Sequence, residues 1–180
     1  ILAGNIMNNG GIAERLVNVA KVIAGRMPGA LAQSNVVANM LFGAISGSGA
    51  AAAAAIGGTI GPMEKKEGYD PIYSSAVNIV SAPTGMLIPP SNLMIVYSTI
   101  AGSVSVAALF MGGYLPGILW GVIVMILAGV AAKKRGYVAA EKIPMRMKIK
   151  VILDALPSLL LIVIIIGGIM LGVFTATEAS

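Results

Sequence analysis

Asn78-Ile-Val-Ser-Ala-Pro-Thr-Gly-Met-Leu-Ile-Pro-Pro-Ser-Asn92 is the stretch of sequence that says most about the architecture of this chain. It lies inside an apolar segment long enough to cross a bilayer, yet its three prolines and one glycine force a helix to break near the middle of the membrane. Broken backbone at that depth is tolerated only where it is buried in protein or lines a watery cavity, because carbonyl groups facing lipid cost several kcal/mol each. We therefore predict that this break, residues 83–92, belongs to a binding site.

The composition indicates an all-α integral membrane protein. Hydrophobic residues make up 57% of the chain and charged residues only 11%, with a mean hydropathy of +0.91, so charge is too scarce to cover a soluble domain of this length. Three stretches without any charged residue are each long enough to span hydrocarbon, which takes about 20 residues. These stretches are residues 27–63, 71–132 and 155–177.

Missing residue types argue against several classes of function. The chain has no cysteine and no histidine, which excludes disulfides and removes the commonest general base and metal ligand. The net charge of +5 reflects basic residues at the ends of apolar stretches, as the positive-inside rule predicts, so we expect a lipid bilayer and no nucleic acid as the partner. An intramembrane enzyme would need a base beside a nucleophile such as Ser48, and this chain offers none at mid-membrane.

The pattern of apolar, basic and helix-breaking residues divides the chain into seven parts. Glu64, Glu67 and Asp70 are expected to be interfacial and solvated, with Asp70 capping a helix that Pro71 begins. The predicted parts are 1–27, the end of a membrane helix plus an interfacial basic segment; 28–67, a re-entrant helical hairpin; 71–98, a discontinuous transmembrane helix; 104–132, a transmembrane helix; 133–150, a cytoplasmic basic loop; 151–172, a transmembrane helix; and 173–180, the truncated start of another element.

The hairpin is favoured over a single crossing by the distribution of charge. If residues 31–63 crossed once, the basic residues within 15–26 and those at 65–66 would lie on opposite sides, against the positive-inside rule. If the segment instead turns at its tip, residues 46–49, both basic groups are cytoplasmic. Each arm then has about 15 residues, or roughly 22 Å of helix.

Both interruptions offer chemistry for binding ions. The tip, Ser46-Gly-Ser-Gly49, would present free carbonyls where one arm ends and free amides where the other begins. Amides favour an anionic group and carbonyls a hard cation, so the tip and the break could together enclose sodium. The alternative is that glycine and serine serve only for packing or kinking. For Asn35 and Asn39 we expect hydrogen bonds between helices.

Several motifs, in order along nearly the whole chain, resemble the large membrane subunit (M subunit) of tripartite ATP-independent periplasmic (TRAP) transporters, which belong to the ion transporter superfamily. Lys65-Lys-Glu-Gly-Tyr69 and Pro90-Ser-Asn92 look more like the sialic acid branch than the dicarboxylate branch. The motifs are Ala3-Gly-Asn-Ile-Met7, Phe42-Gly-Ala-Ile-Ser-Gly-Ser-Gly49, Gly61-Pro-Met63, Gly68-Tyr-Asp70, Ile88-Pro-Pro-Ser91, the segment 105–110, Tyr114-Leu-Pro-Gly117 and the segment 172–178.

The resemblance implies an elevator-type secondary transporter in the bacterial inner membrane, with several membrane passes. A sodium gradient would drive uptake of a small organic anion, either a sialic acid, a related sugar acid or a C4-dicarboxylate. A periplasmic substrate-binding protein (P-type) would deliver the substrate, and a small membrane subunit (Q-type) would complete the complex. The second half of the family's fold is missing, so we expect this chain to be a fragment that does not transport alone.

Matched onto this sequence, the resemblance also implies site residues. One sodium ion would be held by Ser46, Gly47, Ser48, Gly85, Met86 and Pro89. The substrate would contact Ser48, Pro90, Ser91 and Asn92. A passive channel or scaffold subunit, with breaks that line a pore or merely kink helices, is the alternative, and flux without a sodium gradient or binding protein would support it.

Overall fold

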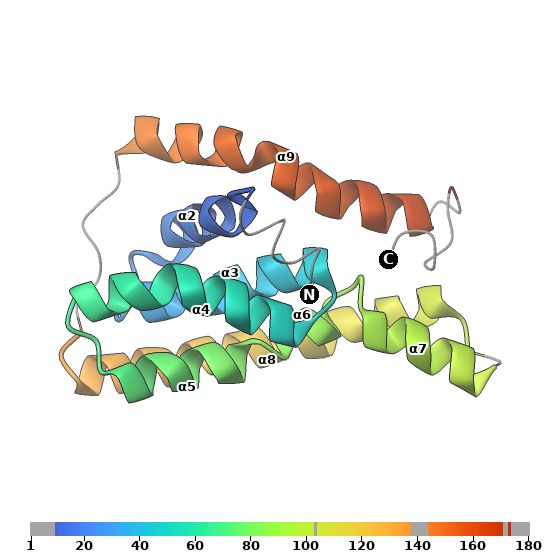
Figure 1. Cartoon of the computed structure of the whole chain (residues 1–180), viewed down its shortest axis with the longest axis horizontal. Helices are drawn as coiled ribbons and strands as arrows, with labels where there is room; N and C mark the ends of the chain where they lie inside the picture. The colour runs from blue at the N-terminus through green and yellow to red at the C-terminus, as the bar shows by residue number, and fades with distance from the viewer. Residues whose placement is uncertain (1–9, 103, 138–143, 171–172, 174–180) are drawn as a thin grey trace.

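The structure, a computed structural model, describes residues 10–102, 104–137, 144–170 and 173. This part of the chain contains helices and no strands, which confirms the all-α prediction. Figure 1 labels the helices in chain order. They are α2 (Ile12–Ala24), α3 (Ala30–Ser46), α4 (Gly49–Lys66), α5 (Pro71–Ser81), α6 (Thr84–Leu87), α7 (Asn92–Ala101), α8 (Val106–Lys134) and α9 (Met145–Met170).

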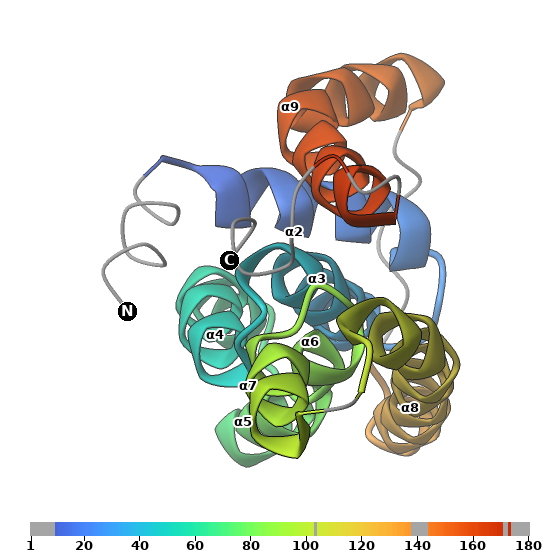
Figure 2. The same ribbon diagram turned by 90° about the vertical axis from the view of Figure 1, so that its right-hand side faces the viewer.

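Helices α3, α4, α5 and α8 run along the long axis of the molecule, and α2 and α9 cover one side of them (Figures 1 and 2). Helix α3 is buried along nearly its whole length, because it packs against α2, α4, α5, α6 and α8. The apolar face of α2, including Leu16 and Val17, joins Phe42 and Ile56 in one core cluster. The amphipathic segment therefore buries its apolar face in protein.

Helix α8 packs through a row of small side chains. With its 29 residues it is about 44 Å long, and it is long and apolar enough to cross a membrane. Gly117 and Gly121 allow neighbouring segments to approach the α8 backbone closely. A β-carbon on Gly117 would lie 2.7 Å from the Ile88 side chain, and one on Gly121 would lie 2.5 Å from the Met40 sulfur. The buried residues of α8 recur at helical spacing and are Phe110, Gly113, Gly117, Gly121, Val124, Ala128 and Ala132.

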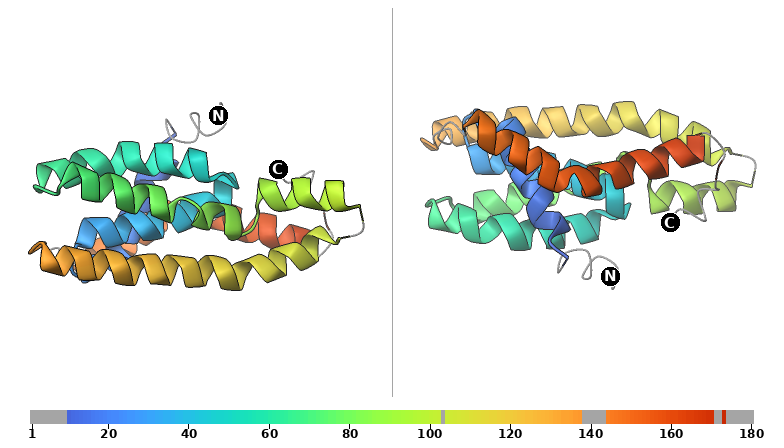
Figure 3. Two further views of the ribbon diagram at one scale, coloured as in Figure 1. Left: turned by 90° about the horizontal axis from the view of Figure 1, so that it is seen from below. Right: turned by 90° about the horizontal axis from the view of Figure 1, so that it is seen from above.

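The predicted discontinuous helix consists of three pieces. Helices α5 and α6 meet α7 at a bend of 47°, and together these pieces pass the same length and hydropathy test as α8. Asp70 caps α5 by accepting a hydrogen bond from the Ile72 amide at 3.1 Å, and Pro71 is the first helical residue, as the sequence predicts. Figure 3 shows α7 continuing beyond the end of the hairpin formed by α3 and α4.

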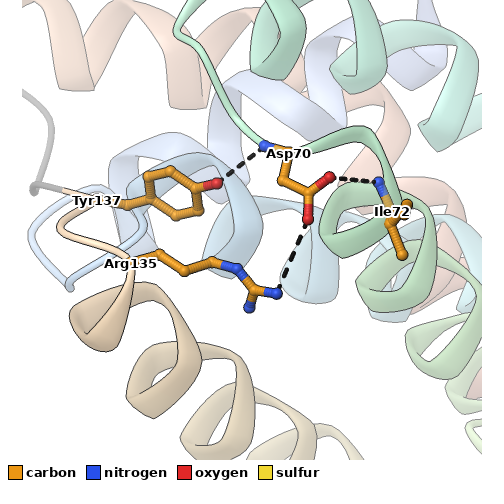
Figure 4. Close-up of polar contacts among 4 residues, drawn as sticks. All are labelled: Asp70, Ile72, Arg135 and Tyr137. Atoms are coloured by element: carbon orange, nitrogen blue, oxygen red, sulfur yellow. Dashed lines mark hydrogen bonds and ion pairs between the residues drawn. The ribbon is translucent and has the colours of Figure 1, made fainter.

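The basic ends of the helices gather at one end of the molecule. Helices α2, α4 and α8 end there and α9 begins there, on the left of Figure 1. Tyr137 ties the turn before α5 to the end of α8, because its hydroxyl accepts a hydrogen bond from the Asp70 amide at 2.8 Å (Figure 4). Its ring also stacks on Tyr69, with the ring centres 4.2 Å apart. Arg135 lies 3.8 Å from the Asp70 carboxylate and 4.9 Å from the centre of the Tyr73 ring.

Some predicted boundaries differ from the observed ones. Helix α8 extends to Lys134 and α9 begins at Met145, so both ends of the predicted basic loop 133–150 are helical. Residues 145–150 consist of good helix formers directly after Pro144, which explains the early start of α9. The discontinuous helix continues to Ala101 instead of ending at Ser98. Residues 1–9, 171–172 and 174–180, with the predictions made for them, lie outside the described part.

Candidate functional site

The tip is a tight connection between two helices. Gly47 ends α3 in the left-handed conformation, with φ of 60°, and its amide donates to the Gly43 carbonyl at 2.8 Å. Ser48 is extended and caps α4, since its hydroxyl accepts from the Ala51 amide at 3.3 Å. The Ser46 hydroxyl donates to the Ser48 carbonyl at 3.3 Å. The first amides of α4 therefore point out of the tip, as at any helix start.

The break exposes carbonyl groups for a specific reason. Pro89 and Pro90 have no N–H, so the carbonyls of Gly85 and Met86 lose the donors that a continuing helix would supply four residues later. The Ser91 hydroxyl compensates at one of these, donating to the Met86 carbonyl at 2.5 Å. The Gly85 carbonyl is left without a donor from the residue four positions on.

The structure brings the tip and the break together. A β-carbon on Gly47 would lie 3.0 Å from the Pro90 carbonyl oxygen and 3.2 Å from the Asn92 amide nitrogen. A β-carbon on Gly49 would lie 3.1 Å from the Ala82 carbonyl oxygen. Two segments that are 33 or more residues apart along the chain therefore form one polar backbone site.

A close crossing of two glycines holds this site together. A β-carbon added to Gly43 would lie 2.0 Å from the α-carbon of Gly85, and one added to Gly85 would lie 2.5 Å from the α-carbon of Gly43. Backbone meets backbone at this point, so any side chain would push α3 and α6 apart. Gly43 and Gly47 form a small-xxx-small pair, which is the sequence signal that could have indicated this contact.

The position of the break along α8 gives its depth. A β-carbon on Gly113 would lie 2.5 Å from the Leu87 carbonyl oxygen, and one on Gly117 would lie 3.2 Å from the Ile88 nitrogen. These glycines are about 10 to 17 Å from the start of a helix about 44 Å long. The break therefore lies well inside the length of α8, at a distance from both of its ends.

A buried polar network connects the two arms of the hairpin to α5. The Asn39 amide lies 2.9 Å from the Ser81 hydroxyl and 3.0 Å from the Asn78 side-chain oxygen, and it also donates to the Asn35 side-chain oxygen at 2.7 Å. Asn78 donates in turn to the Ala53 carbonyl of α4 at 2.9 Å. These contacts confirm the predicted hydrogen bonds between helices for Asn39. The Asn35 side-chain oxygen accepts from Asn39 within α3.

Glu64 is the clearest departure from expectation. It was predicted to be solvated at the interface, but only 1% of it is exposed. Helix α4 carries six consecutive alanines with no distinct apolar face, so the sequence does not reveal which side of its last turn faces α3 and α5. Glu67, also predicted to be solvated, is exposed, and Asp70 is partly exposed.

The predicted site residues differ in how accessible they are. Ser46, Ser48 and Met86 are half-buried, and Asn92 is exposed. The backbone of Gly47 and Gly85 takes part in close contacts, as described above. Pro89, Pro90 and Ser91 are buried, and the Ser91 hydroxyl is used internally, so its predicted contact with substrate stays a prediction.

The oxygen atoms available at the tip and the break would suit the coordination of a monovalent cation. They are hydroxyl and carbonyl oxygens without net charge, the kind of ligand that sodium takes at broken helices. Within the described ranges, no group of three or more His, Cys, Asp or Glu residues could hold a metal ion. The donor set therefore suits a weakly held hard cation better than a tightly bound divalent metal.

A helical hairpin whose tip meets a discontinuous helix deep in an apolar bundle is the arrangement of a membrane transporter. Comparison with known proteins specifies the class. The family model "Tripartite ATP-independent periplasmic transporter, DctM component" matches residues 1–180, and the chain belongs to this family. The predicted resemblance to the large TRAP subunit is thereby confirmed.

Three relatives each match the whole chain. It is 59% identical to "Uncharacterized protein YgiK" of Salmonella typhimurium, covering 41% of that protein. It is 38% identical to the sialic acid TRAP transporter large permease protein of Vibrio cholerae, covering 42%, and 36% identical to the C4-dicarboxylate TRAP transporter large permease protein of Rhodobacter capsulatus, covering 44%. The chain thus spans about two fifths of the length of these relatives, and the last two identities do not separate the two branches.

Proposed function

We propose that this chain is the part of a TRAP permease that binds sodium and couples it to the uptake of a small organic anion. The observation that carries this proposal is the contact between tip and break, with the Pro90 carbonyl oxygen 3.0 Å from the β-carbon position of Gly47. Together they offer the Pro90 carbonyl oxygen beside the tip and the hydroxyl oxygens of Ser46 and Ser48.

The hairpin is proposed to be re-entrant. Its arms, at 17 and 18 residues, measure about 26 and 27 Å, a little less than the roughly 30 Å of a hydrocarbon core. Both arms have their outer ends at the basic end of the molecule, and the tip reaches only part of the way along α8 (Figure 1). In an elevator motion the hairpin and the break would move as one body, since the crossing of Gly43 and Gly85 joins them.

The substrate is proposed to be an organic anion at the start of α4. The positive end of the helix dipole favours a carboxylate there, with Ser48 and the exposed Asn92 within the same site. Two of the relatives with named substrates fit a carboxylate, because sialic acid and C4-dicarboxylates both carry one. The proposed partners are a periplasmic substrate-binding protein and a small membrane subunit, in a bacterial inner membrane.

Uptake by the full-length permease tests this proposal. Proteoliposomes containing the permease and the small membrane subunit would be supplied with the substrate-binding protein, its ligand and a sodium gradient. Ser48→Ala should raise the sodium concentration for half-maximal uptake. Ser34→Ala is the matched control, because the Ser34 hydroxyl donates to the Ala30 carbonyl of its own helix at 2.7 Å, away from the tip. Uptake that does not depend on sodium would contradict the proposal.

A further inference from the structure

Glu64 occupies an unusual position for a carboxylic acid. It lies in the last turn of α4, beyond the apolar part of the hairpin, and is 1% exposed although its neighbours Lys65 and Lys66 are exposed. Among the described residues, the one ion pair within 4 Å joins Arg135 to Asp70. No basic side chain in this part of the chain is therefore paired with the Glu64 carboxyl. Burying an ionised carboxylate without a partner is costly.

Three polar atoms from three helices surround this position without hydrogen-bond partners. They are the Oε1 atom of Glu64 in α4, the Nδ2 atom of Asn35 in α3 and the hydroxyl of Ser74 in α5. The three residues are 1%, 1% and 9% exposed. Asn35 and Ser74 both act on the Glu64 carboxyl, so the three groups share one buried site. A buried polar group without a partner is costly, so this arrangement requires an explanation.

The surrounding charges do not neutralise an anion at this site. Glu67, in the turn directly after α4, opposes ionisation of Glu64. The nearby titratable groups from the turn and α5 are the phenols of Tyr69 and Tyr73. From α2, the Lys21 ammonium lies 3.1 Å from the Met63 sulfur, and from the end of α8 Arg135 pairs with Asp70. Burial, the largest influence, raises the pKa of Glu64 from 4.5 to about 7, although Ser74 and Asn35 lower it.

We propose that Glu64 is a proton-binding site at the base of the hairpin, where its neutral carboxyl is shared with Asn35 and Ser74. A protonated carboxyl has one donor and free acceptor capacity, so it can accept from the Asn35 amide and donate to the Ser74 hydroxyl. All three orphaned groups are then satisfied with no buried charge. A sodium ion suits the site less well, because the Asn35 Nδ2 atom is a donor and repels cations.

The site also joins the buried network described above. The Asn35 side-chain oxygen accepts from Asn39, whose amide reaches Ser81, and the Thr84 hydroxyl donates to the Ser81 carbonyl at 2.6 Å. Polar groups therefore run from Glu64 to the first residue of α6 at the break. Loss of the proton places a charge at one end of this network and should weaken the packing of α4 on α3 and α5.

Infrared spectroscopy of the full-length permease with ¹³C-labelled glutamate would detect the proton directly, without any requirement for transport. The protonated-carboxyl band should be present near pH 6, decline through about pH 7 and be absent from Glu64→Gln. Glu67→Gln is the matched control, since Glu67 is exposed in the turn directly after α4, and should retain the band. Spectra of wild type and Glu64→Gln with identical pH dependence between pH 5 and 9 would overturn the proposal.

A second variant keeps the test decisive if Glu64→Gln does not fold. The Ser74 hydroxyl can accept from the neutral carboxyl, but it lowers the pKa of Glu64 by donating to the ionised form. Ser74→Ala preserves the carboxyl and removes this donor, so the band should decline at a higher pH than in wild type. An unchanged midpoint in a folded Ser74→Ala permease would contradict the shared site. Spectra recorded in sodium chloride and in potassium chloride distinguish a proton site from a cation site. If the pH at which the band is half lost falls as the sodium concentration is raised, but not as the potassium concentration is raised, the site binds sodium and the proton assignment is overturned.

Discussion

Replacing Gly43 with alanine should separate the hairpin from the break. The new β-carbon would lie 2.0 Å from the α-carbon and 2.9 Å from the nitrogen of Gly85, whereas ordinary contact begins at 3.4 Å. Both obstructing atoms belong to backbone, so no side chain can rotate away and α3 must move relative to α6. Overpacking of this kind typically costs about 1–3 kcal/mol, and we expect the upper end of that range.

Thermal unfolding of the purified full-length permease, with and without sodium, measures this effect. Gly43→Ala should lower the unfolding temperature and reduce the stabilisation that sodium provides, because the oxygens of tip and break no longer meet. Gly58→Ala is the matched control: its β-carbon has nothing within 4 Å in α4, so it should be neutral or stabilise by up to about 1 kcal/mol. Gly43→Ala with the stability and sodium response of wild type would refute the close crossing.

Four further predictions concern the remaining buried and surface contacts. Asn39→Ala should destabilise the full-length permease by about 1–3 kcal/mol in denaturant unfolding, since it leaves buried polar partners unsatisfied, and a loss below about 0.5 kcal/mol would argue against the network. Arg135→Gln should cost at most about 1 kcal/mol in the same assay, because the ion pair with Asp70 is exposed. Tyr137→Phe should cost about 1 kcal/mol, because the Asp70 amide loses its acceptor. A loss of stability in Arg135→Gln much larger than that in Tyr137→Phe would contradict these expectations. Relative to Glu64→Gln, the wild type should lose stability as the pH rises from 4.5 to about 7, because Glu64 releases its proton near pH 4.5 in the unfolded chain but holds it to about pH 7 in the folded chain. Unfolding temperatures of both proteins across this pH range measure the effect. A rise in the unfolding temperature of the wild type relative to Glu64→Gln would contradict the account.

Much of the fold follows from local sequence rules. Prolines and glycines interrupt apolar segments at the tip and the break, and the structure has interruptions at both. The Asp70 cap and the long apolar α8 are likewise local features, as are the basic ends that gather on one side of Figure 1. These predictions need only the neighbouring residues along the chain.

The contacts that assemble the site depend on tertiary packing. The sequence shows that Gly43 and Gly85 are glycines, but not that they face each other, since glycine in a membrane helix packs or kinks equally well. Glu64 follows the same logic: its charge and its neighbours Lys65 and Lys66 favour solvent, yet the turn of α4 directs it toward α3 and α5. Such positions become visible only when three helices are placed together.

Equilibrium binding of radioactive sodium to the full-length permease tests the central claim, that tip and break together hold sodium. Gly47→Ala should weaken one class of sodium site about tenfold, equivalent to about 1.4 kcal/mol, because its β-carbon would crowd the Pro90 carbonyl at 3.0 Å. Gly68→Ala imposes the same backbone strain, with φ of 77°, but in open space, and should bind sodium like wild type. Equal sodium affinity in the two variants would contradict the account.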